Sequence, residues 1–248
     1  MTHKALIQKK DELVLRNISN VAWDGFNYLG YETRWFTADE FKAGEVEVTQ
    51  DTVVCAFIWM YLEALKRLGI EPPANVDYPD DLKPYLGRAV WRSTIDSVRR
   101  ELVDPKEHFF VKPYSSQKGF TGFITNQERR QVRLSGWPSD TEVWCSEIVE
   151  FVSEYRFFVM RGVIEGVGHY RGNPTIFPDG KIVQEAAAAW KDAPASYCLD
   201  FGVDAHGRTL LVEVNDGHSM GDYGLYPPLY ARLCEARWCE LTGKDPLV

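Results

Sequence analysis

The chain has 248 residues, of which 45% are hydrophobic and 26% charged, a composition typical of a globular protein with one large domain or two small ones. Its formal net charge of −8 disfavours a broad nucleic-acid-binding surface. It contains no run of about 18 apolar residues and its N-terminus lacks the apolar core of a signal peptide, so we expect a cytoplasmic protein without a membrane span. The five cysteines form no CxxC pair, so we expect neither zinc nor disulfides.

Residues 1–105 alternate short apolar runs with helical periodicity, a pattern that favours an α/β domain with parallel strands. The pattern predicts strands at 12–16 and 51–57 and helices at 17–30, 58–69 and 91–102. Residues 71–84 contain four of the thirteen prolines and are expected to form a loop.

Residues 106–248 show the alternation of antiparallel strands and hairpins, so an α+β organisation is expected there. One hairpin turns at Arg161-Gly162 and another at residues 204–207. A C-terminal helix is expected to begin at Pro227-Pro228, where a missing amide hydrogen costs nothing. We therefore divide the chain into an N-terminal domain, 1–105, and a second domain, 106–248.

Two lysines lie beside a glycine-flanked loop in the segment "VKPYSSQKGFTG". A strand is expected to present Lys112, and the loop presents Lys118. Ammonium groups and close backbone amides suit a polyphosphate, although the spacing is not that of a Walker loop. Two surface lysines on a solvated hairpin would give the same pattern, so both interpretations stay open at this point.

The hairpin at Arg161-Gly162 brings arginines together. Its two-residue turn sets a register that pairs Arg156 with Val167 and places Arg156, His169 and Arg171 on one face. Guanidinium groups gathered on one face suit a phosphate or a carboxylate. The alternative is that Arg156 pairs with Glu154 or Glu165 on a solvated face.

The apolar strand "LLVEVN" ends in oxygen ligands. Glu213 and Asn215 are two residues apart and therefore share one face of the strand. If the preceding turn "DAHG" is a four-residue loop, Asp200 faces Leu211 and joins that face, whereas a three-residue loop would turn it away. Two carboxylates and an amide oxygen are hard ligands of the kind that Mg²⁺ prefers.

The order of these motifs resembles the ATP-grasp superfamily, in particular the clade of short members named for one arginine and two lysines. The resemblance covers about residues 108–226 and is carried by "VKP…KGFTG", "SEIVEFVSEYRFFV", "HYRG" and "LDFGVD…LLVEVN". It implies an ATP-grasp fold in which ATP lies between residues 106–150 and 151–248. It also implies that the N-terminal α/β domain is of the type that precedes an ATP-grasp domain.

The resemblance further implies a role for each site residue. The residues implied to contact ATP are Lys112 and Lys118 at the phosphates, Glu150, Phe151 and Val152 at adenine through the backbone, and Glu154 at the ribose hydroxyls. Two arginines, Arg156 and Arg171, are implied to lie near the transferred phosphate and the substrate. The implied magnesium ligands are Asp200, Glu213 and Asn215.

These parts favour a ligase that depends on ATP and Mg²⁺, in which a carboxylate attacks the γ-phosphate and an amine converts the acyl phosphate into an amide. Such chemistry depends on charge neutralisation more than on a protein nucleophile. The superfamily implies two alternatives, a kinase that acts on a hydroxyl and an ATP-binding assembly factor that docks a protein partner. The loop "SSQKGFTG" is shorter than in longer ligases and no large substrate domain is evident, so the substrate is left open as a small molecule, a peptide or a protein.

Overall fold

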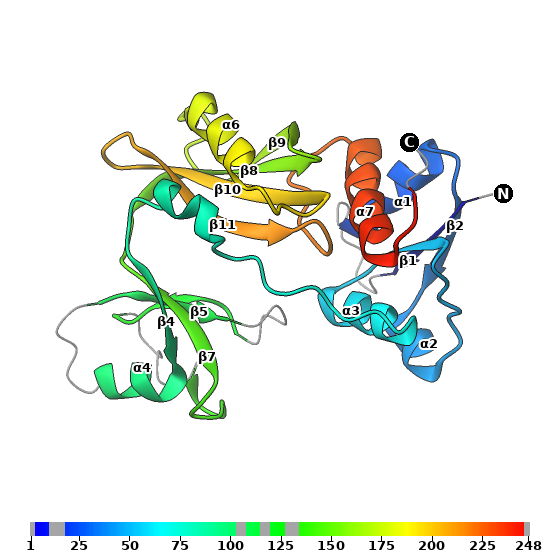
Figure 1. Ribbon diagram of the computed structural model, residues 1–248, viewed down its shortest axis with the longest axis horizontal. Coiled ribbons are helices and arrows are strands. Elements are labelled where there is room, and N and C mark those ends of the chain that lie inside the picture. The colour runs from blue at the N-terminus through cyan, green and yellow to red at the C-terminus, as the bar shows by residue number, and fades with distance from the viewer. Residues whose placement is uncertain (1–2, 10–17, 103–107, 115–119, 127–133, 246–248) are drawn as a thin grey trace.

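The computed structural model describes residues 3–9, 18–102, 108–114, 120–126 and 134–245. The N-terminal strands form a parallel sheet in the order β2-β1-β3 (Figure 1). The elements of this part are β1 (Lys4–Gln8), α1 (Ile18–Tyr28), β2 (Glu32–Phe36), α2 (Ala38–Ala43), β3 (Thr52–Cys55) and α3 (Ile58–Arg67). The parallel α/β pattern and the two longer helices are confirmed, whereas the strand expected at 12–16 lies outside the described residues.

The second sheet is antiparallel and has the order β4-β7-β5-β6. Its elements are β4 (Val90–Thr94), α4 (Ile95–Glu101), β5 (Phe110–Pro113), β6 (Phe123–Ile124) and β7 (Glu142–Ser146). The prediction of a helix over 91–102 is wrong for its first four residues, because residues 90–94 form a strand that pairs with β7. The hydroxyl of Thr94 then caps α4 by accepting a hydrogen bond from the amide of Ser97. The domain boundary at residue 105 stays a prediction, and this pairing favours a boundary before β4.

The third sheet is antiparallel, has the order β11-β10-β8-β9 and contains both expected hairpins. Its elements are β8 (Phe151–Met160), β9 (Val163–Gly172), β10 (Ser196–Asp204) and β11 (Thr209–Asp216), with α6 (Gly180–Ala189) and the 3₁₀ helix η1 (Asp80–Tyr85) packed on one face. The turn at Arg161-Gly162 has φ angles of 50° and 79°, as a two-residue hairpin turn of this kind requires.

Two β-bulges alter the predicted register between β8 and β9. A bulge adds a residue to one strand and so exchanges the faces of the residues beyond it. Arg156 therefore faces Gly168 and not Val167, while His169 faces Tyr155 and contacts its ring at a centroid distance of 4.9 Å. The prediction that His169 shares the face of Arg156 is wrong for this reason.

A further bulge corrects the register between β10 and β11. A four-residue turn predicts that Val203 faces Arg208 and Asp200 faces Leu211, but Val203 faces Thr209. The bulge after Asp200 then shifts the pairing by one more residue, so Asp200 faces Glu213. Asp200 also faces Arg156 on its other side. The bulge thus preserves the prediction that Asp200 shares the face of Glu213, although the partner is different.

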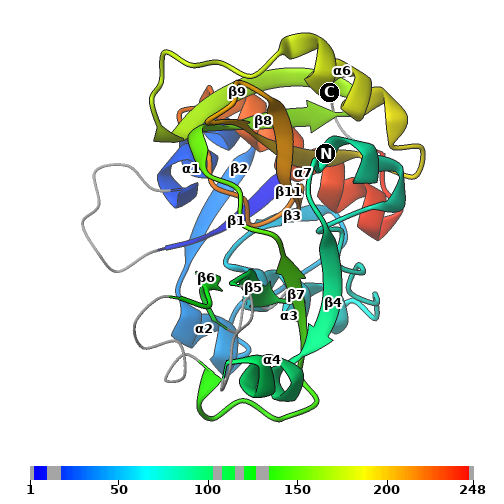
Figure 2. The same ribbon diagram turned by 90° about the vertical axis from the view of Figure 1, so that its left-hand side faces the viewer.

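The last helix, α7 (Pro227–Thr242), begins at the expected prolines and returns to the N-terminal sheet. It packs against α1 and β3 on one side and against β8 and β10 on the other, so one core joins the first and third sheets. The second sheet has a core of its own and lies below the third sheet in Figures 1 and 2. Among the helices that the structure describes, none is both long and apolar enough to cross a membrane.

Candidate active site

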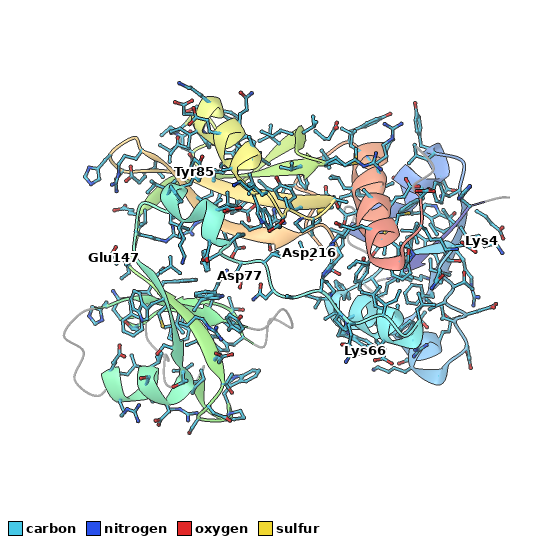
Figure 3. All side chains as sticks on the ribbon, in the orientation of Figure 1. Lys4, Lys66, Asp77, Tyr85, Glu147 and Asp216 are labelled. Atoms are coloured by element: carbon cyan, nitrogen blue, oxygen red, sulfur yellow. The ribbon has the colours of Figure 1, made fainter. Side chains whose placement is uncertain are left out.

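A cleft of about 780 Å³ is lined by residues of the second and third sheets and by the ends of neighbouring loops. This volume lies within the range of about 300–1,000 Å³ that is usual for small-molecule sites. Of the residues implicated by the sequence, those that line the cleft are Lys112, Phe151, Glu154, Arg156, Arg171, Asp200, Glu213 and Asn215. Figure 3 labels three further lining residues, Asp77, Glu147 and Asp216.

A row of three charged side chains crosses the third sheet, with Arg156 on β8, Asp200 on β10 and Glu213 on β11. The guanidinium of Arg156 donates from Nε to Asp200 Oδ1 at 2.8 Å and from Nη2 to Asp200 Oδ2 at 2.7 Å. Arg156 is 6% exposed and Asp200 is 2% exposed, so this is a buried, bidentate ion pair. Burial raises the pKa of Asp200, and the charge of Arg156 opposes this rise without cancelling it.

Glu213 connects this row to the lysine on β5. Lys112 Nζ donates to Glu213 Oε2 at 2.8 Å. The amide nitrogen of Asn215 donates to Glu213 Oε1 and to Asp200 Oδ2, both at 3.2 Å, so the three expected metal ligands do lie together. Burial acts to raise the pKa of Glu213, but the charge of Lys112 and the hydrogen bonds from Lys112 and Asn215 outweigh it and lower the pKa to about 2. Glu213 is therefore ionised at neutral pH.

Glu154 is buried and has partners on both carboxylate oxygens. Tyr170 Oη donates to Oε2 at 2.8 Å, and Arg171 Nη1 donates to Oε1 at 2.9 Å. The side chain of Arg171 is 71% exposed, so it can turn from Glu154 toward a bound ligand. Arg156 pairs with Asp200 and not with a neighbouring glutamate, which was the alternative that the sequence left open.

Four residues that the sequence implies at the ATP site, namely Glu150, Phe151, Val152 and Lys118, have no described side-chain contact that tests their role. Phe151 lines the cleft, while the carbonyls of Glu150 and Val152 accept hydrogen bonds from the amides of Ala205 and Asn173. Their contact with adenine therefore stays a prediction. Lys118 lies outside the described residues, although Thr121 and Gly122, which follow it, line the cleft.

The segment of the chain that forms most of this cleft matches a known protein family. A family model for the ATP-grasp domain, described as family 2 of the clade named for one arginine and two lysines, matches residues 85–233, which is more than half of the chain. The chain belongs to this ATP-grasp family. The matched segment contains the second and third sheets together with every site residue that the motifs implicate. No curated protein sequence matches the chain.

Solved ATP-grasp structures share the architecture of the whole chain. D-cycloserine synthetase DcsG has a TM-score of 0.58 at 14% identity, with 96% of this chain and 99% of that chain covered. D-alanine–D-alanine ligase from Bacillus anthracis has a TM-score of 0.56 at 13% identity, with 97% of each chain covered. A RimK domain ATP-grasp protein from Sphaerobacter thermophilus has a TM-score of 0.55 at 13% identity, with coverage of 93% and 99%. At these identities the likeness shows the ATP-grasp fold alone.

Three side chains, of Asp200 on β10 and of Glu213 and Asn215 on β11, fit magnesium, the metal implied by an ATP-grasp site. Asp200 and Glu213 offer two carboxylates, and Asn215, whose Nδ2 donates to both of them here, would offer its amide oxygen once the amide is turned. A magnesium ion would complete such a set with water and phosphate oxygens. Within the described ranges no group of three or more His, Cys, Asp and Glu side chains is arranged to hold a metal ion. The fit therefore depends on the amide of Asn215.

Two residues that complete the charged part of the ATP-grasp cleft are not singled out by the motifs. Asp77 precedes the second sheet and accepts a hydrogen bond from Lys112 at 3.0 Å. Tyr170 donates to Glu154 from the neighbouring strand. Asp77 lies in none of the motifs, and Tyr170 lies in "HYRG", where the resemblance assigns a role only to Arg171.

Tyr223 lies outside the motifs and contacts Arg156, whose guanidinium carbon is 4.9 Å from the centroid of the Tyr223 ring. Tyr223 has a φ of 39°, a strained value for a non-glycine residue. Tyr223 can approach this closely because residue 168 is a glycine. A Cβ at Gly168 would lie 2.4 Å from the carbonyl oxygen of Tyr223.

Proposed function

We propose that this ATP-grasp protein is an ADP-forming ligase that uses ATP and Mg²⁺ to join a carboxylate to an amine. The observation that carries the proposal is the charged row across the third sheet, in which the ion pair of Arg156 and Asp200 meets that of Glu213 and Lys112. This arrangement places two cations and two carboxylates in the lining of a cleft large enough for a nucleotide.

The hydroxyl groups of the described cleft argue against a serine nucleophile. Ser146 and Ser219 line the cleft, and each donates its hydroxyl to a main-chain carbonyl, of Glu147 and of Ala56 respectively. A serine nucleophile instead needs its hydroxyl directed to a general base. This is consistent with catalysis by polar stabilisation of a reaction between bound groups.

In the proposed reaction a substrate carboxylate oxygen attacks the γ-phosphorus of ATP, and the bond to the β,γ-bridging oxygen breaks to release ADP. An amine then attacks the acyl phosphate, phosphate leaves, and the amide forms with loss of a proton from nitrogen. The substrate carboxylate is ionised at neutral pH and needs no general base. Lys112 holds phosphate oxygens, while Arg171, which is exposed, orients the carboxylate.

Magnesium bound at Asp200, Glu213 and Asn215 would neutralise the charge that develops on the departing diphosphate. The protein's own part is to keep Glu213 ionised and to hold the carboxylates of Asp200 and Glu213 together in the cleft. The low pKa of Glu213 and the two hydrogen bonds donated by Asn215 serve that purpose. The carboxylate and amine are a small molecule or a peptide in this proposal, and a protein substrate is compatible with it.

The test is a hydroxamate assay. The protein is incubated with ATP, Mg²⁺, hydroxylamine and a pool of amino acids and peptides, and the products are identified by mass spectrometry. We expect ADP, phosphate and a hydroxamate, all lost in Lys112→Ala and retained in Lys83→Ala, which changes an exposed lysine on η1. A stable phosphorylated hydroxyl would establish a kinase instead, and AMP with pyrophosphate would indicate adenylation. A protein partner retained without turnover would indicate an assembly factor.

A further inference from the structure

A connector, residues 70–79, joins α3 to η1 and touches both walls of the cleft. On the side of the third sheet, the carbonyl of Asp77 accepts a hydrogen bond from the amide of Val214 at 3.2 Å. On the side of the second sheet, the amide nitrogen of Asn75 donates to the carbonyl of Tyr114. The connector is thus attached to β11 between two of the expected magnesium ligands, Glu213 and Asn215.

Lys112 has two carboxylate partners in this arrangement. Its Nζ lies 2.8 Å from Glu213 Oε2 and 3.0 Å from Asp77 Oδ1, and the lysine side chain is only 10% exposed. Asn75 fixes the second carboxylate, since its Nδ2 donates to Asp77 Oδ2 at 2.8 Å and its Oδ1 accepts from the amide of Asp77 at 3.0 Å. One buried ammonium is therefore opposed by two negative charges.

We propose that Asp77 is an internal counter-anion of Lys112 that competes with the phosphates of the nucleotide. The inference rests on the proposed function, because it takes Lys112 as a phosphate ligand. Asp77 acts through Lys112 and is a positioning residue, not a catalytic one. It holds the ammonium in the cleft without nucleotide, and it opposes the nucleotide once phosphate arrives.

The argument is electrostatic. Glu213 is an expected magnesium ligand, so its charge is taken up when the metal and the nucleotide bind. Asp77 has no such role, and a phosphate that reaches Lys112 also approaches the carboxylate of Asp77, whose Oδ1 lies 3.0 Å from Lys112 Nζ. Two unit charges about 6 Å apart change binding by about threefold in bulk water and by about a hundredfold at an effective dielectric constant of about 20, and about tenfold lies between these limits. The connector consequently keeps nucleotide affinity lower than Lys112 and the metal ligands alone would give.

The decisive variant is Asp77→Asn, which removes the charge and keeps a side chain of the same shape that still accepts from Lys112. Calorimetry with ADP and Mg²⁺ should show binding about tenfold tighter than in the wild type. Asp77→Ala should change in the same direction, and Asp77→Glu, which restores the charge, should return toward wild-type affinity. The matched control is Asp81→Asn on η1, where the carboxylate accepts only from the amide of Lys191 among the contacts described and no change is expected.

Adenosine, which carries no phosphate, separates an electrostatic role from a structural one. Its affinity should be equal in the wild type and in Asp77→Asn, and inorganic tripolyphosphate should gain affinity as ADP does. Unchanged or weaker ADP binding in both Asp77→Asn and Asp77→Ala would overturn the inference, as would an equal gain for adenosine. A wild-type protein that does not bind ADP would overturn the proposed function itself, which is a different result from wild-type binding without any effect of Asp77.

Discussion

The substitution Arg156→Met tests the buried ion pair at the centre of the site. Methionine keeps most of the length of the arginine side chain but leaves Asp200, which is 2% exposed, without its bidentate partner. Breaking a buried ion pair by removing one partner costs about 3–5 kcal/mol, because the remaining charge is buried and uncompensated. For a chain of this size each kcal/mol lowers the melting temperature by about 2–4 °C, so we expect a decrease of about 6–20 °C.

Thermal unfolding followed by circular dichroism measures this change, with Arg92→Met as the matched control. Arg92 pairs with Glu142 on the second sheet, but both side chains are about half exposed, so its loss should cost less than about 1 kcal/mol. The double variant Arg156→Met/Asp200→Leu removes both buried charges and should be more stable than either single variant.

Magnesium supplies an independent check on the same pair. If Mg²⁺ binds Asp200, it replaces part of the missing positive charge and should raise the melting temperature of Arg156→Met more than that of the wild type. A double variant whose loss equals the sum of the two single losses would refute the reasoning, since additivity means that the two side chains are not energetically coupled.

Three further predictions concern the cleft. Lys112→Ala removes a charge-assisted contact of about 1.5–3 kcal/mol and should weaken ATP binding by about 10- to 150-fold, which calorimetry measures; unchanged affinity would remove the phosphate role. Glu213→Gln should retain the fold by circular dichroism yet lose Mg²⁺-dependent turnover, and full activity with Mg²⁺ would show that Glu213 is not a metal ligand. Gly168→Ala places a Cβ 2.4 Å from the carbonyl oxygen of Tyr223, so urea unfolding should show a loss of about 1–3 kcal/mol; an unchanged midpoint would contradict the close approach.

Local patterns in the sequence were sufficient for features that depend on near neighbours along the chain. The helices α1, α3 and α7 follow from apolar spacing, and the hairpin of β8 and β9 follows from its Arg161-Gly162 turn. The pairing of Glu213 with Asn215 on one face follows from the two-residue repeat of a strand, and their side chains do make a hydrogen bond at 3.2 Å. In each case the physical cause acts between residues that are close together along the chain.

Long-range pairing decided the features that the patterns missed. Residues 91–94 fall within the predicted helical repeat, yet they belong to β4, because β7 offers them a strand partner far along the chain. Bulges determined the face of His169, since one extra residue reverses the alternation of side chains and no local motif marks where it is inserted.

The charges of the site required tertiary structure above all. Lys112 lies 101 residues from Glu213 and 35 residues from Asp77, and the three meet only because the connector runs along β11 beside the second sheet. The sequence marks Lys112 and Glu213 as polar groups at the ends of apolar strands, whereas Asp77 is one acidic residue among several in a proline-rich loop. Burial strengthens the interaction of these charges, and through that interaction Lys112 lowers the pKa of Glu213. The same charges in water would interact weakly and would leave that pKa near its ordinary value.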